Sequence, residues 1–318
     1  MKLSYFIINA SRLLEQITFE ARLLTEPCRS AHWLDIQTTN QGKLEALLQP
    51  LELDPIILQD LEDKIHGPSV VAYDQALFMR FPMPLKSGEP RLFLGMVCLS
   101  EVLVTFHQHD FPELEEASRQ LGLHPLHNAT VTAILFHLLD TLFDRNLQSL
   151  LTLRHKIHNI AHQLYSGSED IAIPDLLALK EDLSRLNANL EDQLYCLAVG
   201  KRQDDTPLNP KRMRAYFINL EEKIQHGCRS ASRLEKRLHD LHLQYMLELQ
   251  DKSEHRVRLL TIVSSIILPL TLISSIYGMN FAHMPELQGE YSYFIILGFM
   301  AAIALGLLGI FYRNGWFE

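Results

Sequence analysis

Two long segments near the C-terminus of this 318-residue chain contain no Asp, Glu, Lys or Arg. The first runs from Leu259 to Pro285 and the second from Tyr291 to Tyr312. A helix needs about 20 mainly apolar residues to cross the hydrocarbon core of a bilayer. Two such runs at the end of a charged chain are hard to bury as a core hairpin. We therefore predict two membrane-spanning helices, at 259–278 and 291–312, joined by a loop at 279–290.

Motifs of common enzymes are also missing. The sequence contains no P-loop, no nucleophile elbow and no H-E-x-x-H motif, so we expect neither an enzyme nor a cofactor bound for chemistry. Basic residues (29) are fewer than acidic residues (38), which argues against nucleic acid as a partner. No two cysteines form a C-x-x-C pair, so reduced structural thiols are expected. The four are Cys28, Cys98, Cys196 and Cys228.

The first 125 residues have the pattern of an α/β domain. Strands are predicted at 3–9 and 31–37, and two more pairs within 69–81 and 91–111. Short helices are predicted at 42–51 and 54–63, the second with Asp54 as N-cap and Pro55 at its first position. Residues 1–125 are therefore predicted to form a compact cytosolic sheet domain.

Residues 126–258 are predicted to be helical. One helix is expected from an N-cap at Asn128 to about residue 165, and a second after Pro174, ending at Gly200. From Lys211 no proline occurs until Pro269, so a single helix at 211–277 would be about 100 Å long. Such a stalk helix needs neighbours to cover its apolar stripe. That stripe consists of Leu234, Leu238, Leu241, Tyr245 and Leu249.

Basic residues flank the two apolar runs on one side only. Lys252, Arg256 and Arg258 precede the first run, and Arg313 begins the tail at 313–318. The intervening loop contains only acidic charges. The positive-inside rule then places both termini in the cytosol. We expect a multi-pass protein of a bacterial-type inner (plasma) membrane, in contact with lipid.

The first apolar run carries hydroxyl groups along one helical face. Its members recur at alternating steps of three and four residues. They are Thr261, Ser264, Leu268, Thr271 and Ser275. Small polar residues can hold membrane helices together, or the face can border water. Two spans cannot enclose a pore, so the second interpretation requires a symmetric ring of chains.

The loop sequence "YGMNFAHMPEL" (277–287) resembles the signature of the CorA magnesium transporter family. The motif lies between two C-terminal spans, and weaker similarities extend over the whole chain. The resemblance implies a funnel-shaped homopentamer that passes hydrated Mg²⁺, and often Co²⁺ or Ni²⁺, without a chemical step. Five first spans would line the pore, and α/β domains would form the cytosolic funnel.

The resemblance also implies roles for particular residues. Gly278, Met279 and Asn280 would form the selectivity filter, where uncharged amides accept hydrogen bonds from the water shell that Mg²⁺ releases reluctantly. Glu286 and Glu290 would attract cations to the outer mouth, although Glu286 also fits a structural turn acid. Thr271 would add a second polar ring. The apolar throat would consist of Val257, Leu260 and Leu268, with Leu260 or Thr261 at the middle level.

In some members of this family Mg²⁺ binds cytosolic acidic residues and closes the pore. Asp60 matches one of those positions, although it also fits a plain surface acid. Asn219 and Glu222 match the others, so one carboxylate is replaced by an amide. A hard-cation site that loses a carboxylate is weaker, and the resemblance therefore implies weak metal sensing.

Two other functions compete with magnesium transport. A zinc transporter of the same superfamily keeps G-x-N, but the M-P-E-L at 284–287 favours the magnesium branch, and the fifteen His residues form no closed ligand set. A membrane-anchored coiled-coil scaffold or enzyme would have neither the hydroxyl face nor the loop motif. Magnesium transport is the function that we expect.

Overall fold

We analysed a computed structural model of the chain. It describes residues 2–19, 30–51, 67–73, 76–84, 90–166, 173–202, 210–279, 289 and 291–316. The chain divides into two compact units, Met1–His239 and Asp240–Glu318. Each unit is described by itself.

The first unit is built on one seven-stranded sheet with the order β2-β1-β3-β7-β6-β5-β4. Neighbouring strands are antiparallel except β3 and β7, which run parallel. Strand β7 begins 65 residues after β3 ends, so this parallel pair joins parts of the chain that are far apart in the sequence. The strands are β1 (Lys2–Ile8), β2 (Leu14–Ile17), β3 (His32–Gln37), β4 (Ser69–Tyr73), β5 (Ala76–Pro82), β6 (Phe93–Cys98) and β7 (Val102–His107).

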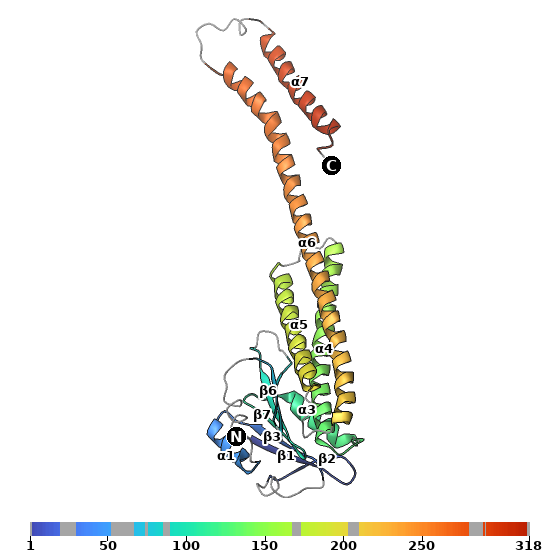
Figure 1. Ribbon diagram of the computed structural model, residues 1–318. Coiled ribbons are helices and arrows are strands. Elements are labelled where there is room, and N and C mark those ends of the chain that lie inside the picture. The colour runs from blue at the N-terminus through green and yellow to red at the C-terminus, as the bar shows by residue number, and fades with distance from the viewer. Residues whose placement is uncertain are drawn as a thin grey trace. The chain divides into compact units, whose positions relative to one another are not determined.

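Helices cover both faces of this sheet (Figure 1). Side chains alternate along each strand, so Leu34 and Ile36 of β3 pack on one face with Leu48 of α1 (Gln41–Leu48). The short helix η2 (Gln49–Leu51) continues α1. Trp33 and Asp35 point to the opposite face. That face is covered by α3 (Pro112–Leu123), α4 (Val131–Tyr165) and α5 (Ile173–Gly200).

A chain of buried amides attaches α4 and α5 to the sheet. Asn146 of α4 donates to Gln193 of α5 (2.9 Å), and Gln193 donates to the carbonyl of Pro82 at the end of β5 (3.0 Å). Asn189 donates to the carbonyl of Met83 (3.2 Å). The carbonyls at this strand end are thus satisfied by side chains, as buried polar groups require.

Gly95 in β6 leaves room for an aromatic ring of the neighbouring strand. Gly95 pairs with Phe106 of β7, and a Cβ added at Gly95 would lie 1.8 Å from the Phe106 ring. The ring of Phe106 in turn stacks on Phe78, with centroids 6.4 Å apart. The glycine is therefore needed for close approach of a side chain, not for an unusual backbone angle.

We expect Gly95→Ala to lower the free energy of unfolding of the sheet by about 1–3 kcal/mol, because Phe106 must leave its position. Urea unfolding of the full-length Trp316→Phe chain in detergent, followed by the emission of Trp33, measures the change. Gly67→Ala is the matched control, since nothing lies within 4 Å of its added Cβ. Equal midpoints for the two variants would contradict the steric explanation.

Helix α6 (Pro210–Tyr277) is one continuous helix of 68 residues, with Pro269 inside it. Within the first unit its N-terminal part packs on α4 and α5. A Cβ at Gly227 would touch Phe143 of α4 and Leu190 of α5. Tyr216 stacks near Phe136, with centroids 4.6 Å apart. This confirms the long helix predicted from the proline-free segment.

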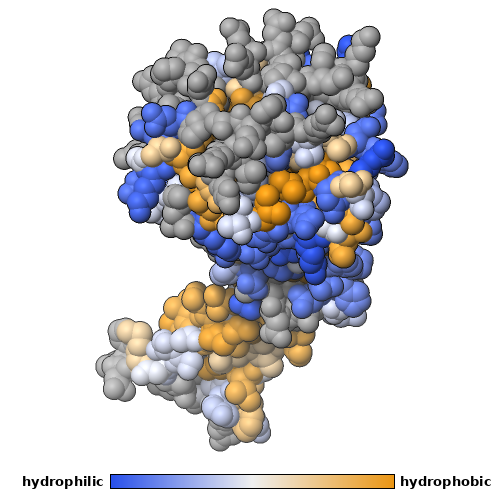
Figure 2. Space-filling model, turned by 90° about the horizontal axis from the view of Figure 1, so that it is seen from below, coloured by the Kyte–Doolittle hydropathy of each residue, from blue (hydrophilic) through white to orange (hydrophobic). Residues whose placement is uncertain are grey.

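The second unit contains the rest of α6 and helix α7 (Ser292–Arg313). Both helices are long and apolar enough to cross a membrane. No Asp, Glu, Lys or Arg occurs at 259–277 of α6 or at 292–312 of α7, and Figure 2 shows mostly apolar side chains on this part of the molecule. No described residue of α7 is buried. In a single chain this apolar surface is uncovered, so it requires lipid or further protein around it.

Most predicted elements are confirmed, and the differences have local causes. The helix expected from Asn128 begins at Val131 with Thr130 as N-cap, because the Thr130 hydroxyl accepts from Ala133 N (3.3 Å). Strand β2 and helix α3 were not predicted. The helix expected at 54–63, with Asp54 and Pro55, lies outside the described residues.

The described cysteines agree with structural thiols. Cys98 and Cys196 are buried and free, and burial raises the pKa of each thiol to about 12. The pKa of Cys228 is raised to about 11, again mainly by burial. Thiols of this kind stay protonated and unreactive near neutral pH. Cys28 lies outside the described residues.

Candidate functional site

The hydroxyl face of α6 is the first part of the candidate site. All five of its members are exposed in the single chain, and at 100° per residue they form a narrow strip along the helix. Leu268, in the middle of the strip, is 72% exposed. Leu260 and Val257, on the preceding turns, are 67% and 59% exposed. Apolar side chains this exposed on a helix are either covered by lipid or another protein chain, or they line an apolar constriction from which water is easily lost.

The two threonines of this face are held by their own helix. Thr261 Oγ1 donates to the carbonyl of Val257 (2.8 Å), and Thr271 Oγ1 donates to the carbonyl of Ile267 (2.9 Å). Each hydroxyl proton is therefore used within the helix, four residues back. What each threonine presents outward is an oxygen lone pair, which accepts hydrogen bonds from water. The sequence pattern predicts that these oxygens lie on one face, but it does not show which acceptors the hydroxyl groups donate to.

The turn that ends α6 explains why a glycine follows Tyr277. Gly278 N bonds to the carbonyls of Ser274 (3.0 Å) and Ser275 (3.2 Å). A Cβ at Gly278 would lie 3.2 Å from the Ser274 oxygen, so a side chain here is crowded. Among the described residues only Gly315 is a glycine with positive φ. Gly278 therefore avoids a tight contact at this turn, and its backbone is not left-handed.

The remaining residues of the loop between α6 and α7 stay sequence predictions. Met279 is described and is 50% exposed. Asn280, Glu286 and Glu290 lie outside the described residues. The proximity of Asn280 to Gly278 therefore follows from the sequence alone.

Charges at the start of the apolar part of α6 are arranged as at a membrane boundary. Lys252 forms an ion pair with Glu248 (3.2 Å), and Arg258 forms one with Glu254 (3.8 Å), each across one helical turn. Arg313 lies in the last turn of α7. Basic side chains thus precede the first apolar run and follow the second, which is the pattern used to predict the orientation of the two helices.

The candidates for metal sensing are only partly described. Asn219 and Glu222 are exposed on α6, three residues apart and thus on one face. The flanking Glu221 pairs with Lys201 (2.7 Å), and Lys223 pairs with Asp140. Asp60 lies outside the described residues. Within the described part of the chain, no group of three or more His, Cys, Asp or Glu residues could hold a metal ion.

A second polar site, in the sheet domain, was missed by the sequence analysis. Asp35 of β3 and His107 of β7 meet at a small cavity beneath α3, 3.3 Å apart at their closest atoms. The signal in the sequence was Asp35, a charged residue in the middle of a strand. Other residues of that strand, Trp33 and Ile36, are buried. The partner of Asp35 depends on strand order, which local patterns do not give.

Comparison with known proteins identifies the family. The profile of the family "CorA-like Mg2+ transporter protein" matches residues 29–313. YfjQ of Bacillus subtilis is 25% identical over 98% of this chain and 97% of its own. A Thermotoga maritima protein named "Cobalt/magnesium transport protein CorA" is 23% identical over 83% of this chain and 77% of its own.

Solved structures share the fold. The CorA magnesium transporter of Methanocaldococcus jannaschii superposes with a TM-score of 0.82 at 19% identity, and the match covers 99% of both chains. The ZntB cytoplasmic domain of Vibrio parahaemolyticus superposes with a TM-score of 0.64 at 10% identity, over 78% of this chain and 98% of the other. At these identities both likenesses concern the fold alone, so the second does not favour the zinc alternative. Given the profile match over residues 29–313, the chain belongs to the CorA-like family of membrane ion transporters, which are not enzymes.

Proposed function

We propose that this protein conducts divalent metal cations, primarily Mg²⁺ and also Co²⁺ and Ni²⁺, through a homopentameric pore lined by α6. The observation that carries the proposal is the exposed strip of hydroxyl oxygens on an otherwise apolar helix. Family membership and the names of relatives, which specify magnesium and cobalt transport, support the choice of ion. The ions cross the membrane without any chemical step.

The difference between the two apolar helices supports a ring with α6 inside and α7 outside. The described part of α7 has no charged residue before Arg313, and Gly298, Gly306 and Gly309 have open space where a Cβ would be. Glycines of this kind let a neighbouring helix approach closely. The polar oxygens on α6 are compatible with a position next to a water-filled pore. The apolar α7, with its glycines, is compatible with an outer position that faces lipid. We propose five chains by analogy with the family.

In the proposed pore, Gly278, Met279 and Asn280 form the selectivity filter at the outer mouth. Mg²⁺ holds six waters at about 2.0–2.1 Å and loses them slowly. Uncharged amide oxygens can accept hydrogen bonds from those waters without removing them. A ring of carboxylates would hold the ion too tightly for release. Glu286 and Glu290, further along the loop, would raise the local cation concentration.

Below the filter, polar and apolar levels would alternate along the pore. The Thr271 and Thr261 oxygens would accept hydrogen bonds from the hydration shell. The leucines at 268 and 260, and Val257, would form a throat that closes by losing water. Ser264 and Ser275 complete the same strip. The exposure of these side chains in a single chain is compatible with such a lining.

We propose that regulation by internal Mg²⁺ is weak. Only Glu222 and Asp60 would supply carboxylates at the matching positions, and Asn219 supplies an amide. With both termini on the cytosolic face of the inner membrane, these residues would be exposed to the ion that has crossed. A site with fewer charges binds a hard cation less tightly.

The test is ion flux into liposomes that contain the purified full-length chain. We expect uptake of Mg²⁺ and Co²⁺ driven by their own gradients, unchanged when a pH gradient is imposed, and slower uptake of Zn²⁺. The mass of the detergent-solubilised protein should correspond to five chains. Zinc uptake that exceeds Mg²⁺ uptake and requires a pH gradient would instead favour the zinc alternative. A monomer or dimer with undiminished transport would exclude the pentameric pore.

A further inference from the structure

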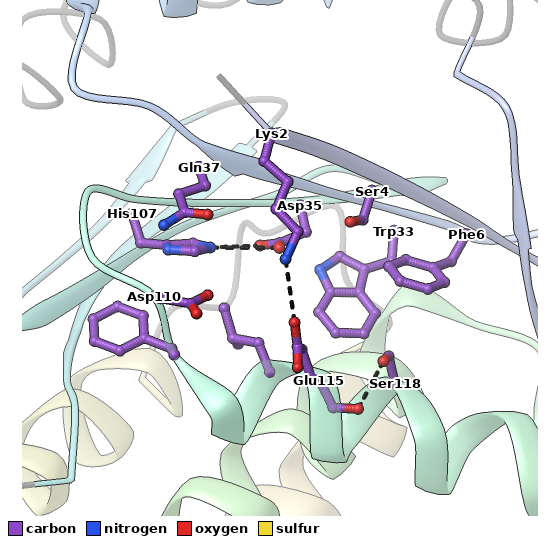
Figure 3. A pocket seen from close by; sticks show the side chains of 12 residues that line it. Lys2, Ser4, Phe6, Trp33, Asp35, Gln37, His107, Asp110, Glu115 and Ser118 are labelled. Atoms are coloured by element: carbon purple, nitrogen blue, oxygen red, sulfur yellow. Dashed lines mark hydrogen bonds and ion pairs between the residues drawn. The ribbon is translucent and has the colours of Figure 1, made fainter.

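A chain of polar side chains lies between the sheet and α3, on the face that is otherwise the apolar core. It surrounds a cavity of about 40 Å³, roughly the space of one or two waters (Figure 3). Trp33 Nε1 donates to Thr105 Oγ1 (3.0 Å), and Thr105 donates onward to Asp35 Oδ1 (2.5 Å). Thr105 is fully buried and Trp33 is 1% exposed. The direction of these bonds fixes Asp35 as the acceptor at the end of the chain.

His107 completes this network, and both of its ring nitrogens face acceptors. Nδ1 lies against the carbonyl oxygen of His109. Nε2 lies 3.3 Å from Asp35 Oδ1 and 3.4 Å from Asp35 Oδ2. A neutral imidazole carries a proton on only one nitrogen. Both contacts are satisfied together when His107 is doubly protonated and Asp35 is ionised, or when a neutral His107 accepts at Nε2 from a protonated Asp35.

The surroundings favour this charged pair over the neutral alternative. The His107 side chain is 4% exposed, and this burial by itself lowers its pKa. The bond and charge of Asp35, the His109 carbonyl and the charge of Asp110 act the other way, and the pKa of His107 is raised. Lys2 of β1 and Glu115 of α3 also line the cavity, where they pair with each other (3.2 Å).

We propose that His107 and Asp35 form a proton-binding site that controls how firmly the segment before α3 is attached to the sheet. The ligand is H⁺ itself, at the pH of the compartment that bathes the sheet domain. The inference concerns the first unit and does not depend on the proposed ion flux.

Loss of the proton has a defined structural consequence. Neutral His107 can donate to His109 or to Asp35, but not to both, so one acceptor loses its donor. His107 also packs on Phe111, the residue that precedes α3, with centroids 5.2 Å apart. Glu113 in the first turn of α3 is 3.7 Å from Arg145 of α4. Release of the His109–Phe111 segment would therefore reach the helical layer through α3.

The direction of the pH dependence follows from the raised pKa. The folded state binds this proton more tightly than the unfolded chain does. The stabilisation is complete below the unfolded histidine pKa of about 6.5 and is lost as the pH rises through the higher folded value. The segment should therefore be fixed at mildly acidic pH and released at alkaline pH.

Trp33 provides a direct readout, because it is part of the hydrogen-bond chain and the protein has only two tryptophans. In the full-length Trp316→Phe variant in detergent, emission should show one step above about pH 6.5. The step should disappear in His107→Gln. It should move to lower pH by about one unit or more in Asp35→Asn, which keeps the shape but removes the charge.

His32→Gln is the matched control. His32 is also buried and lies next to Trp33, but it points to the opposite sheet face, where it bonds to the hydroxyl of Tyr5 (2.7 Å). The emission step should survive this change. If His107→Gln fails to fold, Asp35→Asn still decides, because an unchanged midpoint in that variant would refute the site. A wild-type protein without any step above about pH 6.5 would refute it as well.

Hydrogen–deuterium exchange tests the consequence for α3. Peptides that cover 107–118 should exchange faster above the step than below it, after correction for the intrinsic pH dependence of exchange. In His107→Gln they should exchange fast at both pH values. Equal corrected protection on both sides of the step would show that proton binding does not control this segment.

Discussion

Asn280→Ala should reduce Mg²⁺ uptake into liposomes to the level of liposomes without protein, while the pentamer forms in normal yield. The amide is proposed to accept hydrogen bonds from the waters around a hydrated ion at the mouth of the pore. Without it, each subunit loses one acceptor for the hydration shell, and the ring loses five. Since 1.4 kcal/mol of barrier corresponds to tenfold in rate, a modest loss per subunit is enough for a decrease of about tenfold or more.

Two further measurements separate this role from a structural one. Asn280→Asp adds as many as five negative charges to the ring and should slow release of the ion, so uptake falls although binding at the mouth tightens. Cobalt(III) hexaammine, which has the shape of a hydrated cation but keeps its ligands, should inhibit the unmodified protein and bind the alanine variant weakly. Normal Mg²⁺ uptake by Asn280→Ala would remove this residue from the mechanism. The hydroxyl strip would then be better explained as a contact between helices.

Leu268→Asn should increase ion leakage at rest by about tenfold or more, because a polar ring at the throat stays hydrated and removes a barrier of at least about 1.4 kcal/mol. Leu268 is 72% exposed and lies three residues before Thr271. The experiment compares the initial rate of Mg²⁺ uptake by the variant and by the unmodified protein under the same small inward gradient.

Leu270→Asn is the matched control for this variant. It introduces the same side chain two residues later, about 200° around the helix from Leu268. A polar group there faces away from the proposed pore and should lower the yield of assembled protein more than it raises the leak. Equal leakage in the two variants would indicate general damage to the membrane region and not the opening of a throat.

Much of the candidate pore could be predicted because its signals are local. The absence of charge over 259–285 and 291–312 specifies two apolar helices, and steps of three and four residues specify a face. The structure adds what the pattern does not contain. The hydroxyls of Thr261 and Thr271 donate to carbonyls of their own helix, and a side chain at position 278 would be in tight contact with the Ser274 carbonyl. Both observations depend on atomic positions, which the spacing of apolar and polar residues in the sequence does not determine.

The N-cap of α4 shows a smaller limit of sequence reasoning. Asn128 and Thr130 are both good capping residues, and the pattern cannot rank two candidates that lie two positions apart. The backbone at Thr130 is extended, and its hydroxyl reaches Ala133 N. Helix boundaries of this kind are decided by the chain that leads into the helix, which here packs Leu126 into the core.

By itself the sequence determined that the chain ends in two apolar helices joined by the family's loop motif, because hydropathy, charge and short motifs are properties of contiguous residues. Only the tertiary structure decided that β3 lies beside β7, and hence that Asp35 meets His107, 72 residues away, under α3. The physical reason is that a strand's partner is chosen by how the whole sheet buries its two faces. The free energy that favours this strand order comes from contacts among all seven strands and the helices that cover them. A local sequence pattern therefore does not predict the strand order.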